Sequence, residues 1–138
     1  MKVAIIKYNA GNTQSLLFAL ERLGVDGIVT GEADEILSAD KVIFPGVGEA
    51  SSAMAHIKEH KLDKIIKDLK QPVLGICLGM QLMCEHTEEG DTDCLGIFNT
   101  KVKRFIDLKV PHVGWNKLYN NTGSLFAGEE AAPYVYFV

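Results

Sequence analysis

The residues with the clearest chemical potential are in the pentapeptide Gly-Ile-Cys-Leu-Gly at positions 75–79. An apolar run, 73–77, leads into the cysteine, and a helical pattern begins at Leu78. A nucleophile between two small residues at a strand-to-helix turn is typical of a nucleophile elbow, whose central residue has a strained backbone, often with positive φ. The N-terminus of the following helix would favour thiolate over thiol. We interpret Cys77 as a nucleophile; the alternative is a small hydrophobic residue that ends a core strand.

A second turn, Pro45-Gly46-Val47-Gly48, closes the preceding predicted strand. Taken alone, a proline and two glycines are ordinary turn residues. Beside an elbow they have a further use, because a glycine-lined turn exposes backbone N–H groups. Acyl transfer needs two such donors for the developing oxyanion, and the N–H of Leu78 is placed to supply the other.

The remaining cysteines and histidines give weaker signals. Cys84 falls at a helical position and Cys94 in a loop, and we interpret both as structural. The three cysteines form no CxxC pair and have no metal-ligand spacing, which indicates free thiols in a reducing cytoplasm. We expect neither a cofactor nor a metal. Three histidines are interpreted as solvent-facing helix residues without an assigned function: His56, His60 and His86.

Composition narrows the class of protein. The chain has 138 residues, of which 47% are hydrophobic and 23% charged, as in an ordinary globular domain, and we expect a single domain over residues 1–138. The net charge of −4 gives no basic surface for nucleic acid. We find no apolar run long enough to span a bilayer and expect no leader peptide, so we expect a cytoplasmic protein.

Apolar runs alternate with helical stretches along the first half of the chain. Strands are predicted at 2–8, 27–30, 41–44 and 73–77, and helices at 14–23, 32–38, 51–69 (with a break near His60 as one option) and 78–85. Further strands are predicted at 96–105, 115–119 and 134–138. This order predicts an α/β fold, with a mostly parallel sheet covered by helices on both faces and a small antiparallel extension. Ligands then bind at the carboxyl ends of the strands.

These motifs resemble a known family. The heptapeptide Gly-Ile-Cys-Leu-Gly-Met-Gln at 75–81 resembles the signature of class I glutamine amidotransferases, and 45–48 is similar to their oxyanion strand. The segments Tyr-Asn-Ala-Gly-Asn at 8–12 and Val-Pro-His-Val-Gly-Trp-Asn at 110–116 look like the glutaminase subunit of imidazole glycerol phosphate synthase, of histidine biosynthesis. The resemblance covers the whole chain and implies the flavodoxin-like fold of that family.

The resemblance implies roles for individual residues. Cys77 would attack the glutamine carboxamide and form a thioester, and the N–H groups of Val47 and Leu78 would hold the oxyanion. The glutamine would be bound by four residues: Gly46, Gly48, Gln81 and Glu89. The ammonia would pass to a cyclase subunit, a (βα)₈ barrel in a 1:1 heterodimer, without a cofactor. The cyclase interface would include Asn12, Pro111, His112 and Trp115.

The chain departs from the family pattern in two ways. Lys7 and Asn9 stand where the family has an acidic residue and a glycine. The printed sequence also ends at Val138, where the family continues with a histidine base and its acidic partner. We expect residues 1–138 alone to be inactive on glutamine for that reason.

Three alternatives remain open. The chain could be a non-catalytic binding subunit with the same fold. It could be a chaperone or deglycase with a cysteine elbow, although those have a histidine directly after the cysteine, where this chain has Leu78. It could also be another class I amidotransferase, one that feeds anthranilate, guanylate or cytidylate synthesis; the segment 110–116 disfavours these.

Overall fold

The computed structural model describes residues 1–121, 123–126 and 132–138. They form two compact units, Met1–Arg104 and Phe105–Val138, and each is described by itself. The expectation of a single domain over the whole chain stays a prediction.

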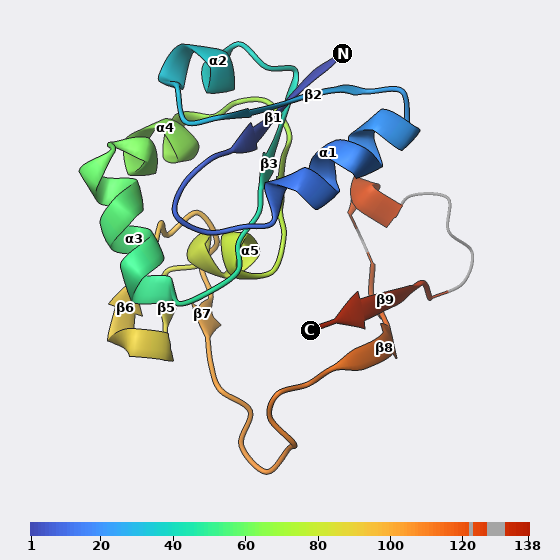
Figure 1. Ribbon diagram of the computed structural model, residues 1–138. Helices are drawn as coiled ribbons and strands as arrows, with labels where there is room; N and C mark the ends of the chain where they lie inside the picture. The colour runs from blue at the N-terminus through green and yellow to red at the C-terminus, as the bar shows by residue number, and fades with distance from the viewer. Residues whose placement is uncertain (122, 127–131) are drawn as a thin grey trace. The chain divides into compact units, whose positions relative to one another are not determined.

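A four-stranded parallel sheet is the centre of the first unit (Figure 1). Its strands are β1 (Lys2–Ile6), β2 (Asp26–Thr30), β3 (Lys41–Phe44) and β4 (Val73–Gly75), in the order β2-β1-β3-β4. The strand β1 is internal, and Ala4, Ile5 and Ile6 are fully buried. A Val- and Ile-rich run of this kind is expected for a strand that is covered on both faces.

Helices cover the two faces of the sheet. They are α1 (Thr13–Arg22), α2 (Ala33–Leu37), α3 (Ala50–Glu59), α4 (Leu62–Asp68) and α5 (Leu78–Leu82). Successive strand residues point to opposite faces. Val3 and Ile5 therefore pack with Leu20 of α1 in one core cluster. Ala4 and Ile6 belong to the other cluster, which α2, α3, α4 and α5 complete. The predicted α/β class, with a mostly parallel sheet, is confirmed.

The long helix predicted over 51–69 is two helices, α3 and α4. Lys61 between them has a φ of 57°, a left-handed conformation that no helix can continue through. The allowed break near His60 is therefore where the chain turns.

The helix after the elbow is shorter than predicted, and the prediction of helix for Cys84 and His86 is wrong. The carbonyls of Leu82, Met83 and Cys84 accept N–H groups from the returning segment 95–98. Because these carbonyls are taken by another part of the chain, the helical ladder stops at Leu82.

Three short strands form a second, small sheet, and only one of them, residues 101–102, lies within the strand predicted over 96–105. They are β5 (His86–Thr87), β6 (Thr92–Asp93) and β7 (Lys101–Val102), with a 3₁₀ turn η1 (Glu89–Asp91) between β5 and β6. The order is β6-β5-β7, antiparallel at β5–β6 and parallel at β5–β7. Glycines and polar residues dominate 85–100, which explains why the periodicity there was weak.

The second unit contains an antiparallel ribbon. The strand β8 (Gly114–Lys117) pairs with β9 (Tyr134–Phe137), and a 3₁₀ turn, η2 (Ser124–Phe126), lies between them in sequence. The two strands predicted at 115–119 and 134–138 are confirmed within one or two residues. Among the described residues, no helix has the length and apolar character that crossing a membrane requires.

Candidate active site

Cys77 occupies the turn between β4 and α5. Its φ is 53° and its ψ −121°, outside the relaxed strand and helix regions, and it is the N-cap residue of α5. Its side chain is exposed to solvent. The predicted positive φ of an elbow is confirmed, and the sulfur is accessible rather than part of the core.

Gly75 and Gly79 of the elbow lie so close to other backbone atoms that a side chain does not fit at either position. A Cβ at Gly79 would collide with the carbonyl oxygen of Phe44 and would lie 2.9 Å from the carbonyl carbon of Pro45. A Cβ at Gly75 would lie 2.7 Å from the Cα of Met80. The end of β3 and the start of α5 are therefore in backbone contact, which brings the loop 45–49 beside Cys77.

Tyr8, just beyond the end of β1, contacts this loop and the strand that precedes it. Its hydroxyl donates a hydrogen bond to the carbonyl oxygen of Pro45 at 2.6 Å, and its ring contacts Phe44 with centroids 5.5 Å apart. Burial, and secondarily the negative charge of a Cys77 thiolate, raises the pKa of Tyr8 well above its usual range. The phenol therefore stays protonated and remains a donor. This role of Tyr8 was not predicted from the sequence. The one signal there was a tyrosine at the end of an apolar strand, since the hydroxyl of a buried tyrosine needs a partner.

The N–H of Leu78, one of the two expected oxyanion donors, is engaged within the chain. It donates to the carbonyl oxygen of Gly46 at 3.3 Å. In a trans peptide the C=O and the following N–H point in opposite directions. The N–H of Val47 therefore points away from the N–H of Leu78 in this structure. A flip of the peptide plane between Gly46 and Val47 would free the N–H of Leu78. It would also bring the N–H of Val47 to the same side as that of Leu78.

Glu89 lies next to the beginning of α3. Its Oε2 accepts the N–H of Ala50 at 3.2 Å, although the two residues are 39 positions apart. Gly48, two residues before Ala50, has a φ of 104° and no atom within 4 Å of where a Cβ would be. The third expected glutamine-binding residue, Gln81, is half-buried on α5, and its N–H bonds to the carbonyl of Cys77 at 3.1 Å. The fold thus places Glu89 by the loop 45–49 and Gln81 one helical turn after Cys77.

Glu49 is the N-cap of α3. The N–H groups of Ser52 and Ser51 bond to its carboxylate, and these bonds hold the pKa of Glu49 below its usual value. A carboxylate at this position stabilises the helix N-terminus that follows the loop 45–49.

The expected interface residues fall in both units. Asn12 is exposed, and its side chain caps α1 by accepting the N–H of Ser15 at 3.4 Å. In the second unit, Pro111 is exposed and His112 packs against Phe137, with ring centroids 5.3 Å apart.

Trp115, also in the second unit, is 69% exposed. Its ring meets Tyr136 of β9 edge-on, with centroids 5.4 Å apart. A large aromatic side chain fixed by a neighbour but open to solvent is a typical anchor for a partner protein.

Comparison with known proteins gives consistent matches. Residues 4–137 match the family model described as glutamine amidotransferase class-I. The subunit HisH of imidazole glycerol phosphate synthase from Bacteroides fragilis is 57% identical over the whole chain, which spans 72% of that relative. The corresponding subunit from Idiomarina loihiensis is 44% identical, again over the whole chain and 71% of the relative.

A solved structure of a glutamine amidotransferase has the same fold. The TM-score is 0.68, with 17% sequence identity, over 83% of this chain and 62% of that one. At this identity the likeness supports the fold alone.

Proposed function

The chain belongs to the class I glutamine amidotransferases, and on that basis we propose that it is the glutaminase subunit of an imidazole glycerol phosphate synthase. The observation that carries this proposal is the elbow: Cys77 has a strained positive φ and an exposed sulfur beside a glycine-containing loop. The sequence relatives supply the choice of synthase within the family.

In the proposed reaction the Cys77 sulfur adds to the carboxamide carbon of glutamine. The N–H groups of Leu78 and Val47 stabilise the oxyanion that forms, as preorganised donors do in acyl transfer. The C–N bond then breaks, the proton that the thiol gave up is delivered to the leaving nitrogen, and ammonia departs from a thioester. Water cleaves the thioester, which releases glutamate and restores the thiol.

Four residues are proposed to hold the glutamine. Gly48 leaves the loop backbone open to the substrate, because no atom of the described residues lies within 4 Å of where its Cβ would be. Gly46 lets the loop pack against the elbow, because a Cβ there would collide with Tyr8, Leu78 and Gly79. Gln81 lies one helical turn from the nucleophile and offers an amide to the substrate. Glu89 is exposed beside the start of α3, and its carboxylate suits the α-ammonium group.

The geometry of the loop predicts a slow enzyme in the absence of its partner. With Leu78 bonded to Gly46, no two-donor oxyanion hole is assembled. A partner raises the rate if it binds more tightly to the chain with the 46–47 peptide flipped than to the chain in the conformation described here. Without that difference in affinity it cannot shift the equilibrium between the two conformations.

The proposed partner is a cyclase with a (βα)₈ barrel, in a 1:1 complex through Asn12, Pro111, His112 and Trp115. Coupling of the two subunits keeps ammonia from protonation and diffusion before it reacts. We place the complex in the cytoplasm, where a free thiol such as Cys77 stays reduced.

The test uses a chain that also carries the histidine base and acidic partner with which the family continues. Purified cyclase is titrated into it, and binding and glutamate release are followed together. We expect a 1:1 complex at micromolar concentrations or below, and glutamate release that rises when the cyclase and its nucleotide ligand are both present. Full glutaminase activity without any partner, or no complex at micromolar concentrations, would contradict the assignment.

A further inference from the structure

The C-terminal end of α3 carries a cluster of metal-binding side chains that the glutaminase reaction does not use. His56, Glu59 and His60 each offer one ligand atom, and these three atoms lie within 4.8 Å of one another. We propose that this cluster is a binding site for a divalent transition-metal ion, Zn²⁺ in the first instance. The proposal is independent of the function proposed for the elbow.

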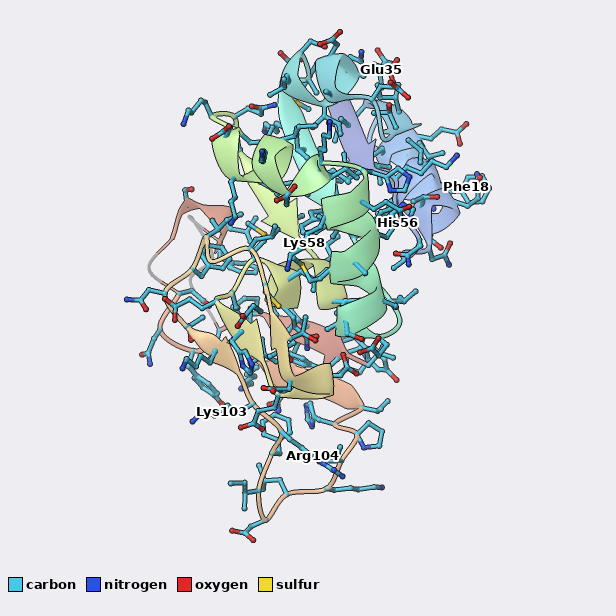
Figure 2. The ribbon with its side chains drawn as sticks, turned by 90° about the vertical axis from the view of Figure 1, so that its left-hand side faces the viewer. Phe18, Glu35, His56, Lys58, Lys103 and Arg104 are labelled. Atoms are coloured by element: carbon cyan, nitrogen blue, oxygen red, sulfur yellow. The ribbon has the colours of Figure 1, made fainter. Side chains whose placement is uncertain are left out.

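Helix geometry places the two imidazoles together. Residues four apart lie on the same helix face, and the rings of His56 and His60 are stacked with centroids 4.0 Å apart and planes inclined by 27°. Figure 2 shows His56 projecting from α3 on the side away from Lys58, so the lysine does not share its face.

A hydrogen bond settles which nitrogen of His60 is available to a metal. Nδ1 of His60 lies 2.9 Å from the carbonyl oxygen of His56. A carbonyl can only accept, so Nδ1 carries the proton, and Nε2 of the neutral ring has the free lone pair. Histidine ligands of metals are commonly oriented by such a bond from the other ring nitrogen to a backbone carbonyl.

The electrostatics of the helix end favour a cation. His60 caps α3, and the carbonyl groups of the last turn give this end a partial negative charge. The carboxylate of Glu59 adds a full negative charge at the same place. Two neutral imidazoles and a carboxylate form the donor set that Zn²⁺ accepts, whereas Mg²⁺ and Ca²⁺ prefer oxygen ligands alone.

Small side-chain movements would complete the site. Ligand atoms on a tetrahedral Zn²⁺ with bonds of 2.0–2.1 Å lie about 3.3 Å apart. The cluster has to contract from within 4.8 Å, chiefly by movement of the exposed Glu59 side chain, because His60 is held by its bond to the His56 carbonyl. The fourth position would be open to water.

A cavity adjoins the two histidines. Its volume is about 500 Å³, and the ends of β1 and β2 form its other side, with Lys7, Tyr8, Thr30 and Glu32 among the lining residues. An ion at the cluster would therefore border a space that can hold water or a small anionic ligand. It would also secure the end of α3 at the point where the chain reverses at Lys61.

The experiment is a calorimetric titration of the purified, untagged protein with Zn²⁺ alone. All variants carry Cys77→Ser, so that the exposed thiol cannot capture the ion. We expect one Zn²⁺ per chain. His56→Asn and His60→Asn should each lower the affinity for Zn²⁺ roughly tenfold or more, because loss of a residue that merely orients a metal ligand already costs that much. Glu59→Gln should weaken binding as well.

His86→Asn is the matched control, because it removes one partly exposed imidazole that is not in the cluster. This variant should bind Zn²⁺ like the parent, and circular dichroism should show that every variant is folded. Thermal unfolding gives a second readout: Zn²⁺ should raise the Tm of the parent and of His86→Asn but not of His60→Asn. Equal binding by His60→Asn and the parent, or no binding below about millimolar Zn²⁺, would overturn the proposal.

Discussion

Replacement of Gly79 by alanine tests whether the backbone contact at the elbow is as close as the structure describes. In an ordinary helix, glycine to alanine stabilises by up to about 1 kcal/mol, because alanine is the better helix former. Here the new Cβ would meet the main-chain carbonyl groups of Phe44 and Pro45. These atoms cannot rotate away, so α5 or β3 must move. Overpacking typically costs about 1–3 kcal/mol, and we expect the upper end of that range, so the net effect is destabilising by about 2 kcal/mol or more.

The assay is equilibrium unfolding in urea, followed by circular dichroism. Gly79→Ala should lower the midpoint without changing the m value, which would assign the loss to the folded state. Gly123→Ala is the control, since no atom of the residues that the structure describes lies within 4 Å of its Cβ position. Its stability should stay within about 0.5 kcal/mol of the parent. A Gly79→Ala protein as stable as the parent, or more so, would refute the close contact.

Three further predictions follow from the same geometry. Tyr8→Phe keeps the ring but leaves the Pro45 carbonyl without its donor, so the free energy of unfolding should fall by about 1–3 kcal/mol, measured in urea, and glutaminase activity with the cyclase should fall too. Limited alkylation with iodoacetamide should label Cys77 first. It is exposed, whereas burial raises the pKa of both Cys84 and Cys94, whose thiols therefore stay protonated to higher pH; peptide mass mapping that found Cys94 modified first would contradict this. Trp115→Ala should weaken cyclase binding by about 2 kcal/mol with unchanged circular dichroism; an unchanged dissociation constant would remove Trp115 from the interface.

The elbow and the central strands could be predicted from the sequence because their signals are local. Runs such as Val3–Ile6 have no polar interruption, and two glycines bracket a cysteine at a strand end. Each of these patterns restricts the backbone within a few residues. The start of α5 at Leu78 followed from the same pattern, since a nucleophile elbow leads directly into a helix.

The contacts that complete the site could not be predicted, because they join residues far apart in the chain. The bonds from Tyr8 to Pro45 and from Glu89 to Ala50 span 37 and 39 positions. Nothing in the local pattern indicates that Leu78 donates to Gly46, since that bond depends on which way one peptide plane faces. The early end of α5 also depends on a returning segment whose own periodicity is weak.

The metal-binding cluster at the end of α3 could not be predicted from the sequence either. The spacing of His56 and His60 is visible in the sequence, and both were interpreted as solvent-facing. The stacked rings and the bond that fixes the His60 tautomer appear only in the structure. Spacing alone did not distinguish a ligand pair from two surface residues.

The central claim is that Cys77 releases ammonia from glutamine for use by a cyclase, and one comparison tests it most directly. Cyclisation by the complex is measured with glutamine and, separately, with added ammonium salt, for the parent and for Cys77→Ala. We predict that the variant loses glutamine-dependent activity by several orders of magnitude and retains ammonia-dependent activity. Glutamine-dependent cyclisation by Cys77→Ala at a rate near that of the parent would contradict it.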